Sequence, residues 1–221
     1  MKKFITTLAI IFCLCTPVFA QNYDKDELVN INVYEKISPA IVSVVAQLSD
    51  GVSEGTGCII TTDGQILTGW HVVDGAKTID VTTSNGQTYK AKLLAKMKDS
   101  RDLALLKIEP NEKLSTVSFG DSEEVKVGQK VLSIGNPFGF SNTLTQGIIS
   151  RIDYVKNRFQ TDAAINPGCS GGPILNSTGE VIGISQSIYN PDHNISNIGI
   201  GFAIPSNEAV KFITTTKEKS R

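Results

Sequence analysis

The hydrophobic pattern of this chain consists of short apolar and β-branched runs separated by polar turn residues. Asp-Gly and Asn-Gly pairs between the runs are typical of tight turns that join antiparallel strands. In the first half we predict strands over residues 41–48, 57–61, 65–68, 79–83, 88–94 and 103–108. In the second half we predict strands over residues 130–134, 144–152, 158–161, 173–175, 181–187 and 200–204. The pattern therefore predicts an all-β protein with two lobes, each an antiparallel barrel or sandwich.

Helical patterns lie near both ends of residues 21–221. Residues 21–32 are polar and acidic and predict an arm or a short helix, and residues 33–37 predict one helical turn that Pro39 stops. Near the other end, Ser206 is a candidate N-cap, and apolar residues at helical spacing predict a short C-terminal helix over 206–216. The predicted parts between these ends are lobe one at about 38–110, a polar connection at 110–124 and lobe two at about 125–205.

The first twenty residues have the pattern of a secretory signal. A basic start at residues 1–3 precedes a mostly apolar run at 4–14, and a stretch of small residues ends at Ala20. The run is too short for a membrane-spanning helix with stop-transfer flanks, so we predict a signal peptide that is cleaved after Ala20. The mature chain, residues 21–221, is then expected to be exported, either to the periplasm or to the medium. No other segment is long and apolar enough to predict a membrane span.

Charge and cysteine content argue against several function classes. The formal net charge is −1 and no long block of Lys or Arg occurs, so no nucleic-acid partner is expected. Cys58 and Cys169 remain after removal of the signal and are too few for a disulfide framework. They could form one disulfide, but two free thiols are the favoured interpretation. Two histidines and these two cysteines at unsuited spacings argue against zinc, and neither a metal nor a cofactor is expected.

The residues 161–173, TDAAINPGCSGGP, contain a serine between glycines. Gly168 and Gly171 flank Ser170 closely, and glycine allows backbone conformations that a β-carbon would resist. Such a turn can expose the serine hydroxyl and aim several backbone N–H groups into one concavity, as a nucleophile and its oxyanion require. The alternative is a loop between strands with an incidental serine.

His71 and Asp102 are the candidates for the two further groups that a serine nucleophile needs. His71 ends a predicted strand among apolar residues, where a histidine is more often structural. Asp102 directly precedes a strand that is predicted to be buried, and it could equally be a turn residue bonded by its own backbone. Each signal is weak alone. Together, His and Asp in lobe one and Ser in lobe two form an ordered set in an exported all-β chain.

Six motifs extend this set to most of the mature chain. In order they read GTGCIITTDGQILTGWHVV, DLALLKI, GNPFGF, TQGIIS, QTDAAINPGCSGGPI and GIGFAIP. They resemble the protease-domain motifs of the HtrA/Deg family of trypsin-like serine proteases, from about Tyr34 to Val210. The resemblance implies the chymotrypsin fold, which is two six-stranded antiparallel β-barrels followed by a short C-terminal helix.

The resemblance also implies roles for single residues. Ser170 would be the nucleophile, His71 the general base and later acid, and Asp102 the group that orients the imidazole. The backbone N–H groups of Gly168 and Ser170 would form the oxyanion hole. The pocket for the substrate side chain before the scissile bond (the P1 residue) would have a floor and walls formed by Ala164, Ile165, Ser187, Ile188, Ile200 and Gly201. This set contains no acid, so we expect small or branched apolar P1 residues rather than Lys or Arg.

This sequence departs from the family pattern at several positions. Cys169 stands where an asparagine is usual, and we interpret it as a bystander rather than the nucleophile. Gln186 stands where a small hydroxyl residue commonly supports the triad acid, and the loop at 153–157 is short. We expect no PDZ domain within these residues. Family members often form homotrimers through N-terminal aromatic residues, for which Tyr23 and Tyr34 are the candidates here.

The function predicted from these motifs is a serine endopeptidase. It would hydrolyse peptide bonds in unfolded or exposed polypeptide segments through an acyl-enzyme intermediate. A different class of function is a catalytically silent pseudoprotease whose cleft holds peptides. An esterase is disfavoured because the chain has no strand–elbow–helix pattern of an α/β-hydrolase.

Overall fold

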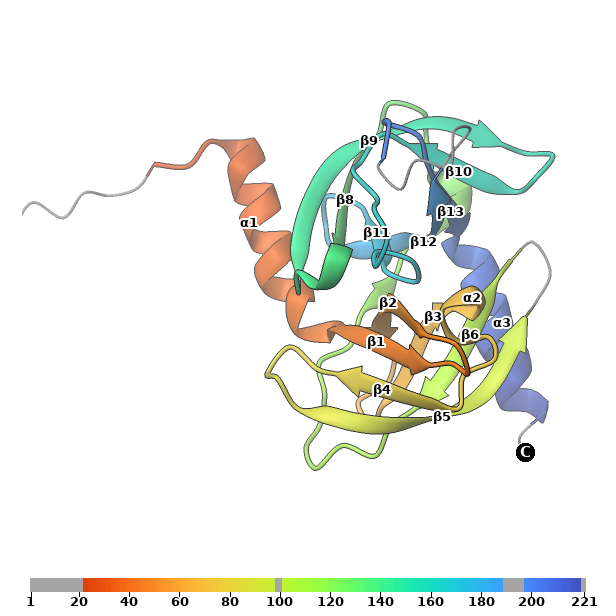
Figure 1. Cartoon of the computed structure of the whole chain (residues 1–221). Coiled ribbons are helices and arrows are strands. Elements are labelled where there is room, and N and C mark those ends of the chain that lie inside the picture. The colour runs from red at the N-terminus through yellow and green to blue at the C-terminus, as the bar shows by residue number, and fades with distance from the viewer. Residues whose placement is uncertain (1–21, 98–100, 189–196, 220–221) are drawn as a thin grey trace, which may run out of the picture.

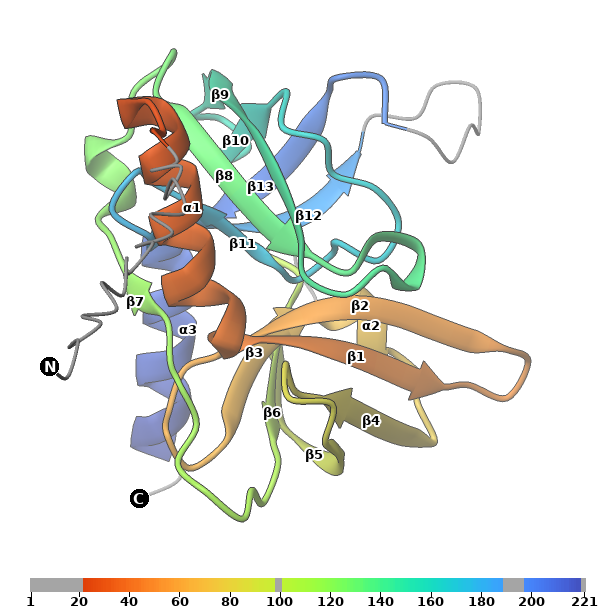
Figure 2. The same cartoon turned by 90° about the vertical axis from the view of Figure 1, so that its left-hand side faces the viewer.

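The computed structural model of this chain describes residues 22–97, 101–188 and 197–219. The signal predicted over residues 1–20 lies outside the described residues. Two β-barrels make up most of the described chain, and Figure 1 shows the second barrel above the first. Helices α1 (Lys25–Ile37) and α3 (Ser206–Lys219) lie along one side of the molecule, as Figure 2 shows.

The first barrel is closed and antiparallel, with strands in the order β1-β2-β3-β6-β5-β4. Alternating apolar residues point into it, and Ile59, Ile66 and Leu106 are fully buried there. Such alternation is what a strand needs when one of its faces is buried. The strands are β1 Ile41–Gln47, β2 Val52–Ile59, β3 Gln65–Gly69, β4 Thr78–Thr82, β5 Thr88–Met97 and β6 Leu103–Lys107.

The second barrel closes through the pairing of β11 with β12, which completes the ring β11-β8-β9-β10-β13-β12. Its strands are β8 Lys130–Gly135, β9 Thr143–Asp153, β10 Arg158–Thr161, β11 Pro173–Leu175, β12 Glu180–Ile188 and β13 Gly201–Pro205. The prediction of two six-stranded antiparallel barrels with a C-terminal helix is therefore confirmed. The short strand β7 (Ser118–Phe119), which pairs parallel with β12, was not predicted.

The N-terminal helix is longer than predicted. Instead of an arm and a single turn, α1 is one helix of 13 residues. Asp24 and Glu27 form a reciprocal capping box at its start, and Val33 and Ile37 are buried against the barrels. Because the other faces of α1 are polar, its apolar periodicity is too weak to predict its length. The remaining short helices are α2 Trp70–Val73, η1 Ser38–Ala40, η2 Ser122–Glu124 and η3 Pro137–Gly139.

One cluster of buried side chains holds the two barrels and the terminal helices together. It contains Leu67 of the first barrel, Leu132 and Ile184 of the second, Ile37 of α1 and Phe212 of α3. A shared core of this kind sets the position of one barrel relative to the other, because its close packing allows little adjustment. No helix among the described residues has the length and apolar character to cross a membrane.

Candidate active site at the junction of the two barrels

His71 is presented by the short helix α2, directly after strand β3 ends at Gly69. Its neighbours Trp70, Val72 and Val73 are buried in the first barrel, whereas the His71 side chain is 47% exposed. The apolar residues around His71 therefore anchor the turn and leave the imidazole at the surface.

Asp102 accepts one hydrogen bond from Trp70 and is hydrogen-bonded twice to His71. Its backbone carbonyl accepts from the Trp70 N–H at 2.9 Å, and its Oδ1 accepts from the His71 N–H at 2.8 Å. Its Oδ2 lies 2.5 Å from the Nδ1 of His71. An ionised carboxylate only accepts hydrogen bonds, so Nδ1 carries the proton and the Nε2 of a neutral imidazole is left as an acceptor. Asp102 has φ +42°, a conformation that aspartate tolerates better than most residues.

Ser170 lies in the turn between β10 and β11 and is bonded to both barrels. Its carbonyl accepts from the Thr56 N–H of the first barrel at 2.9 Å. In the second barrel, the Gly171 N–H donates to the Ser185 carbonyl at 2.8 Å. The Ser170 hydroxyl donates to the carbonyl of Gln186 at 3.3 Å. The turn is thus fixed on both sides, and the hydroxyl itself has one long hydrogen bond.

The turn of Ser170 packs against the end of β3, close to the chain that presents His71. A β-carbon built on Gly171 would lie 2.5 Å from the backbone nitrogen of Gly69 and 2.4 Å from the carbonyl oxygen of Thr56. Within the described residues no hydrogen bond joins His71 to Ser170. Catalytic hydrogen bonds are often long or misaligned before substrate binds. The three residues predicted as a triad therefore gather at one place between the barrels.

The peptide units around Gly168 leave two backbone donors free. All described peptide bonds are trans, and the Pro167 carbonyl accepts from the Phe138 N–H at 3.0 Å. In a trans peptide the N–H points opposite to the carbonyl, so the Gly168 N–H points away from Phe138. Neither this N–H nor that of Ser170 has an acceptor in the described part of the chain. Backbone N–H groups are normally paired, and two unpaired ones beside a serine hydroxyl make a donor pair that can bind an oxyanion.

The residues predicted for the P1 pocket lie on adjacent segments of the second barrel. Ile165 is buried, and a β-carbon built on Gly201 would lie 2.8 Å from its Cδ1, so these two residues are in contact. Ile188 of β12 pairs with Gly201 of β13. The other predicted residues are Ser187 on β12 and Ala164 before Ile165, both exposed, and Ile200 before β13, which is half-buried.

The two cysteines are free and buried, as favoured from the sequence. The Cys58 thiol points to the Gly171 carbonyl at 3.8 Å, and Cys169 is 4% exposed within the core of the second barrel. Burial raises the pKa of both thiols, which disfavours the reactive thiolate. Cys169 thus lies next to Ser170 in the sequence while its side chain packs inward.

Gln186 and two buried polar residues add contacts that the sequence did not predict. The backbone carbonyl of Gln186, rather than its side chain, takes the Ser170 hydroxyl. Among the described residues only His71 donates to the Asp102 carboxylate, so no extra hydroxyl supports it there. Thr56 and Asn136 are buried and surround the Ser170 turn. Thr56 lies between two glycines and Asn136 precedes a proline, but both patterns also occur in ordinary turns.

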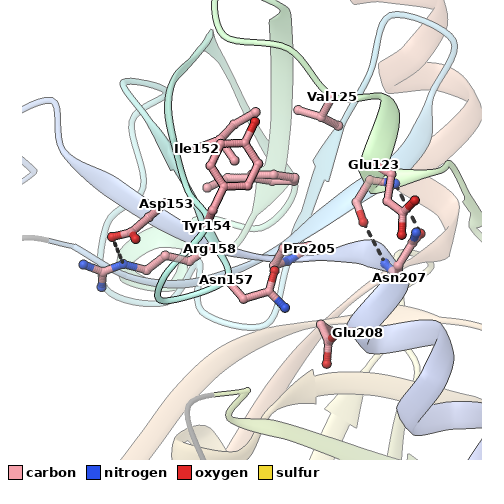
Figure 3. Close-up of a pocket in the computed structure, with 12 residues that line it drawn as sticks. Glu123, Val125, Ile152, Asp153, Tyr154, Asn157, Arg158, Pro205, Asn207 and Glu208 are labelled. Atoms are coloured by element: carbon pink, nitrogen blue, oxygen red, sulfur yellow. Dashed lines mark hydrogen bonds and ion pairs between the residues drawn. The ribbon is translucent and has the colours of Figure 1, made fainter.

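A cavity of about 300 Å³ lies elsewhere on the second barrel and is not lined by the three candidate residues. It is enclosed by η2, the β9–β10 hairpin and the start of α3. Figure 3 shows Tyr154 and Ile152 along one side and Glu123 beside Asn207 on the other. The size of a cavity therefore does not identify the chemical site in this protein.

The sequence of this chain is similar to those of known proteins. Residues 55–184 match the family described as a trypsin-like peptidase domain. The magnetosome formation protease MamE of Paramagnetospirillum magneticum is 46% identical over 169 residues, which are 72% of this chain and 23% of that protein. A probable periplasmic serine endoprotease, DegP-like, of Rickettsia prowazekii is 42% identical over 202 residues, which are 86% of this chain and 39% of that protein.

This chain is also similar in its three-dimensional fold to a solved structure. The HtrA-type protease AlgW with tripeptide has a TM-score of 0.79 and 35% identity, over 87% of this chain and 64% of that one. The present chain spans less than two thirds of the length of each of these three proteins. Most of this chain therefore corresponds to one part of larger proteins.

Proposed function

Because the chain belongs to the trypsin-like peptidases, and within them to the HtrA/Deg family, we propose that it is a serine endopeptidase. The observation that carries the proposal is the 2.5 Å bond between the Nδ1 of His71 and Asp102, at the junction where Ser170 is held between two barrels. This bond sets the imidazole tautomer that a general base needs.

In the first half of the reaction Ser170 attacks the carbonyl carbon of the substrate. Its hydroxyl leaves the carbonyl of Gln186 and gives its proton to the Nε2 of His71 as the new C–O bond forms. The negative charge then lies on the substrate oxygen, opposite the N–H groups of Gly168 and Ser170. Each oxyanion donor lowers such a barrier by roughly 3 kcal/mol. Asp102 stabilises the imidazolium without taking its proton.

The second half releases both products. His71 returns the proton to the leaving amine as the C–N bond breaks, which leaves an acyl group on the Ser170 oxygen. Water then attacks this ester, with His71 again taking a proton and returning it to Ser170. No other group has to be oxidised, reduced or bound for this cycle to close.

Fluorophosphonate labelling tests the proposed nucleophile. We expect the reagent to phosphonylate one residue, Ser170, and to stop cleavage of unfolded casein in proportion to the label. The Ser115→Ala variant is the control for a serine other than the proposed nucleophile, because Ser115 is exposed and lies outside the junction. Its labelling and cleavage should equal those of the unchanged protein. If the protein is not labelled or casein is not cleaved, the peptide-binding pseudoprotease is favoured. A label on Cys169 contradicts the assigned nucleophile.

For the substrate we propose unfolded or exposed segments with small or branched apolar P1 residues. The support is that Ile165 and Ile188 belong to the apolar core cluster at this place and that the six predicted pocket residues include no carboxylate. A lysine or arginine would be desolvated there without a counter-charge. Cleavage of a peptide library checks this: Val, Ile or Ala should dominate P1, and a profile dominated by basic residues contradicts it.

Export and assembly complete the proposal. The Rickettsia relative is named a periplasmic protease, and a signal peptide at residues 1–20 would take this chain out of the cytoplasm too. We also infer homotrimers, since the candidate Tyr23 near the N-terminus is 41% exposed, although the other candidate, Tyr34, packs against the core of the chain. Sedimentation of the mature protein at several concentrations measures the mass of the assembly, and a monomer throughout contradicts this part.

A further inference from the structure

Thr56 contacts the Ser170 turn with both its backbone and its side chain. It lies in β2 of the first barrel and is fully buried. Its N–H donates to the Ser170 carbonyl at 2.9 Å. Its hydroxyl donates to the Gly168 carbonyl at 2.6 Å. One residue of the first barrel thus holds carbonyls on both sides of Cys169.

The direction of the Thr56 hydroxyl is fixed by Asn136. The backbone N–H of Asn136 donates to the Thr56 Oγ1 at 3.0 Å, and its side-chain Nδ2 lies 3.2 Å from the same oxygen. A hydroxyl has one donor and two acceptor positions, and these two N–H groups occupy both acceptor positions. The hydroxyl proton of Thr56 is then donated to the Gly168 carbonyl, which can only accept a hydrogen bond. Every hydrogen-bonding position of this buried hydroxyl is used.

Hydrogen bonds from two different residues set the orientation of the two peptide units that meet at Gly168. The unit before it is held by the Phe138 N–H on the Pro167 carbonyl, and the unit after it is held by Thr56. The Cys169 N–H of that second unit also donates to Asn166 at 2.9 Å. Gly168 has φ +97°, and a β-carbon on it would lie 2.3 Å from the Asn136 carbonyl oxygen. The peptide units can therefore not turn over without breaking buried hydrogen bonds.

We propose that Thr56 is a positioning residue: by holding from the first barrel the peptide units that follow Gly168 and Ser170, it keeps the donor N–H groups of these two residues in their catalytic orientation. The inference rests on the proposed protease function. Thr56 does not touch the substrate; it acts through the carbonyls of the turn. Catalysis by oxyanion donors depends on their being oriented before the reaction starts, because reorientation during the reaction would raise the barrier.

The Thr56→Val variant tests this role, because valine keeps the branched shape and removes only the hydroxyl. We expect kcat to fall roughly 10- to 100-fold and KM to change by less than about threefold, since the donors act on the transition state. Thr56→Ser keeps the hydroxyl and should restore most of kcat. Thr83→Val is the matched control: it removes another buried hydroxyl of the first barrel, bonded to Asn85 and Gln87.

Rates are taken per titrated active site, so that unfolded molecules do not count. If Thr56→Val does not fold, Thr56→Ala removes the same hydroxyl with a smaller side chain and has the same expected result. A purely structural role predicts equal losses of thermal stability in Thr56→Val and Thr83→Val with unchanged kcat in both, which would overturn the inference. Inactivity of the unchanged protein would overturn the proposed function itself and is seen before any variant is made.

Discussion

Replacing Asp102 with asparagine is expected to lower kcat by about 10⁴-fold while the fold is retained. The reason lies in the two acceptors that Asp102 offers to His71. Oδ1 takes the backbone N–H and Oδ2 takes the ring Nδ1. An asparagine has only one acceptor oxygen, and the backbone N–H, which can only donate, requires it. The amide nitrogen then faces Nδ1, so the ring must accept there and carry its proton on Nε2. In that tautomer His71 cannot take a proton from Ser170.

The substitution leaves the local backbone undisturbed. The bond from the Trp70 N–H to residue 102 uses a backbone carbonyl, and asparagine tolerates φ +42° as well as aspartate does. Steady-state kinetics with a peptide substrate measure the effect, and circular dichroism verifies the fold. Asp80→Asn is the control, since Asp80 pairs with Lys90 at the surface, and such a pair has little effect. A kcat of Asp102→Asn within tenfold of the unchanged protein would contradict the assigned role.

The strands were predictable wherever one of their faces is buried. Ile66 and Leu106 face the core of the first barrel, and their neighbours Leu67 and Leu105 are buried on the other face, so β3 and β6 were recognised as short apolar runs. Prediction failed where a segment has too few buried residues to produce an apolar run. The exposed start of β2, with Ser53 and Glu54, lies outside the predicted strand 57–61 although it pairs with β1 in a long hairpin. The length of α1 was missed for the same reason, because only Val33 and Ile37 of that helix are buried.

The candidate residues were predictable from order and motif, but the contacts among them were not. His71, Asp102 and Ser170 were recognised as a set because chemistry requires these three types and the resemblance supplied their order. Thr56 gave no such signal, since its bond to Gly168 joins residues 112 positions apart and ends on a backbone carbonyl. Sequence does not specify which carbonyl a threonine will reach; the relative position of the two barrels determines it.

A methyl group at Gly171 is expected to destabilise the protein by more than about 4 kcal/mol, a loss that few single substitutions cause. The β-carbon would lie 2.4 Å from the Thr56 carbonyl oxygen, 2.5 Å from the Gly69 nitrogen and 2.5 Å from the Thr68 hydroxyl. All three atoms belong to the first barrel, and two of them are backbone atoms that cannot rotate away. Relief requires the barrels to separate or the turn to move, and a moved turn displaces Ser170.

The Gly128→Ala variant distinguishes the steric overlap of an added methyl group from the free-energy cost of a left-handed backbone conformation. Gly128 has φ +87° and Gly171 has φ +84°, but a β-carbon on Gly128 would meet no atom within 4 Å. An alanine there should cost only about 1–2 kcal/mol, the usual penalty for a left-handed residue. Urea unfolding of both variants measures the difference. Free energies of unfolding that agree within about 1 kcal/mol would mean that the junction is loosely packed. The larger expected loss at Gly171 follows because the turn that carries Ser170, the proposed nucleophile, also forms the contact between the barrels, so that we expect stability and activity to depend on the same glycine.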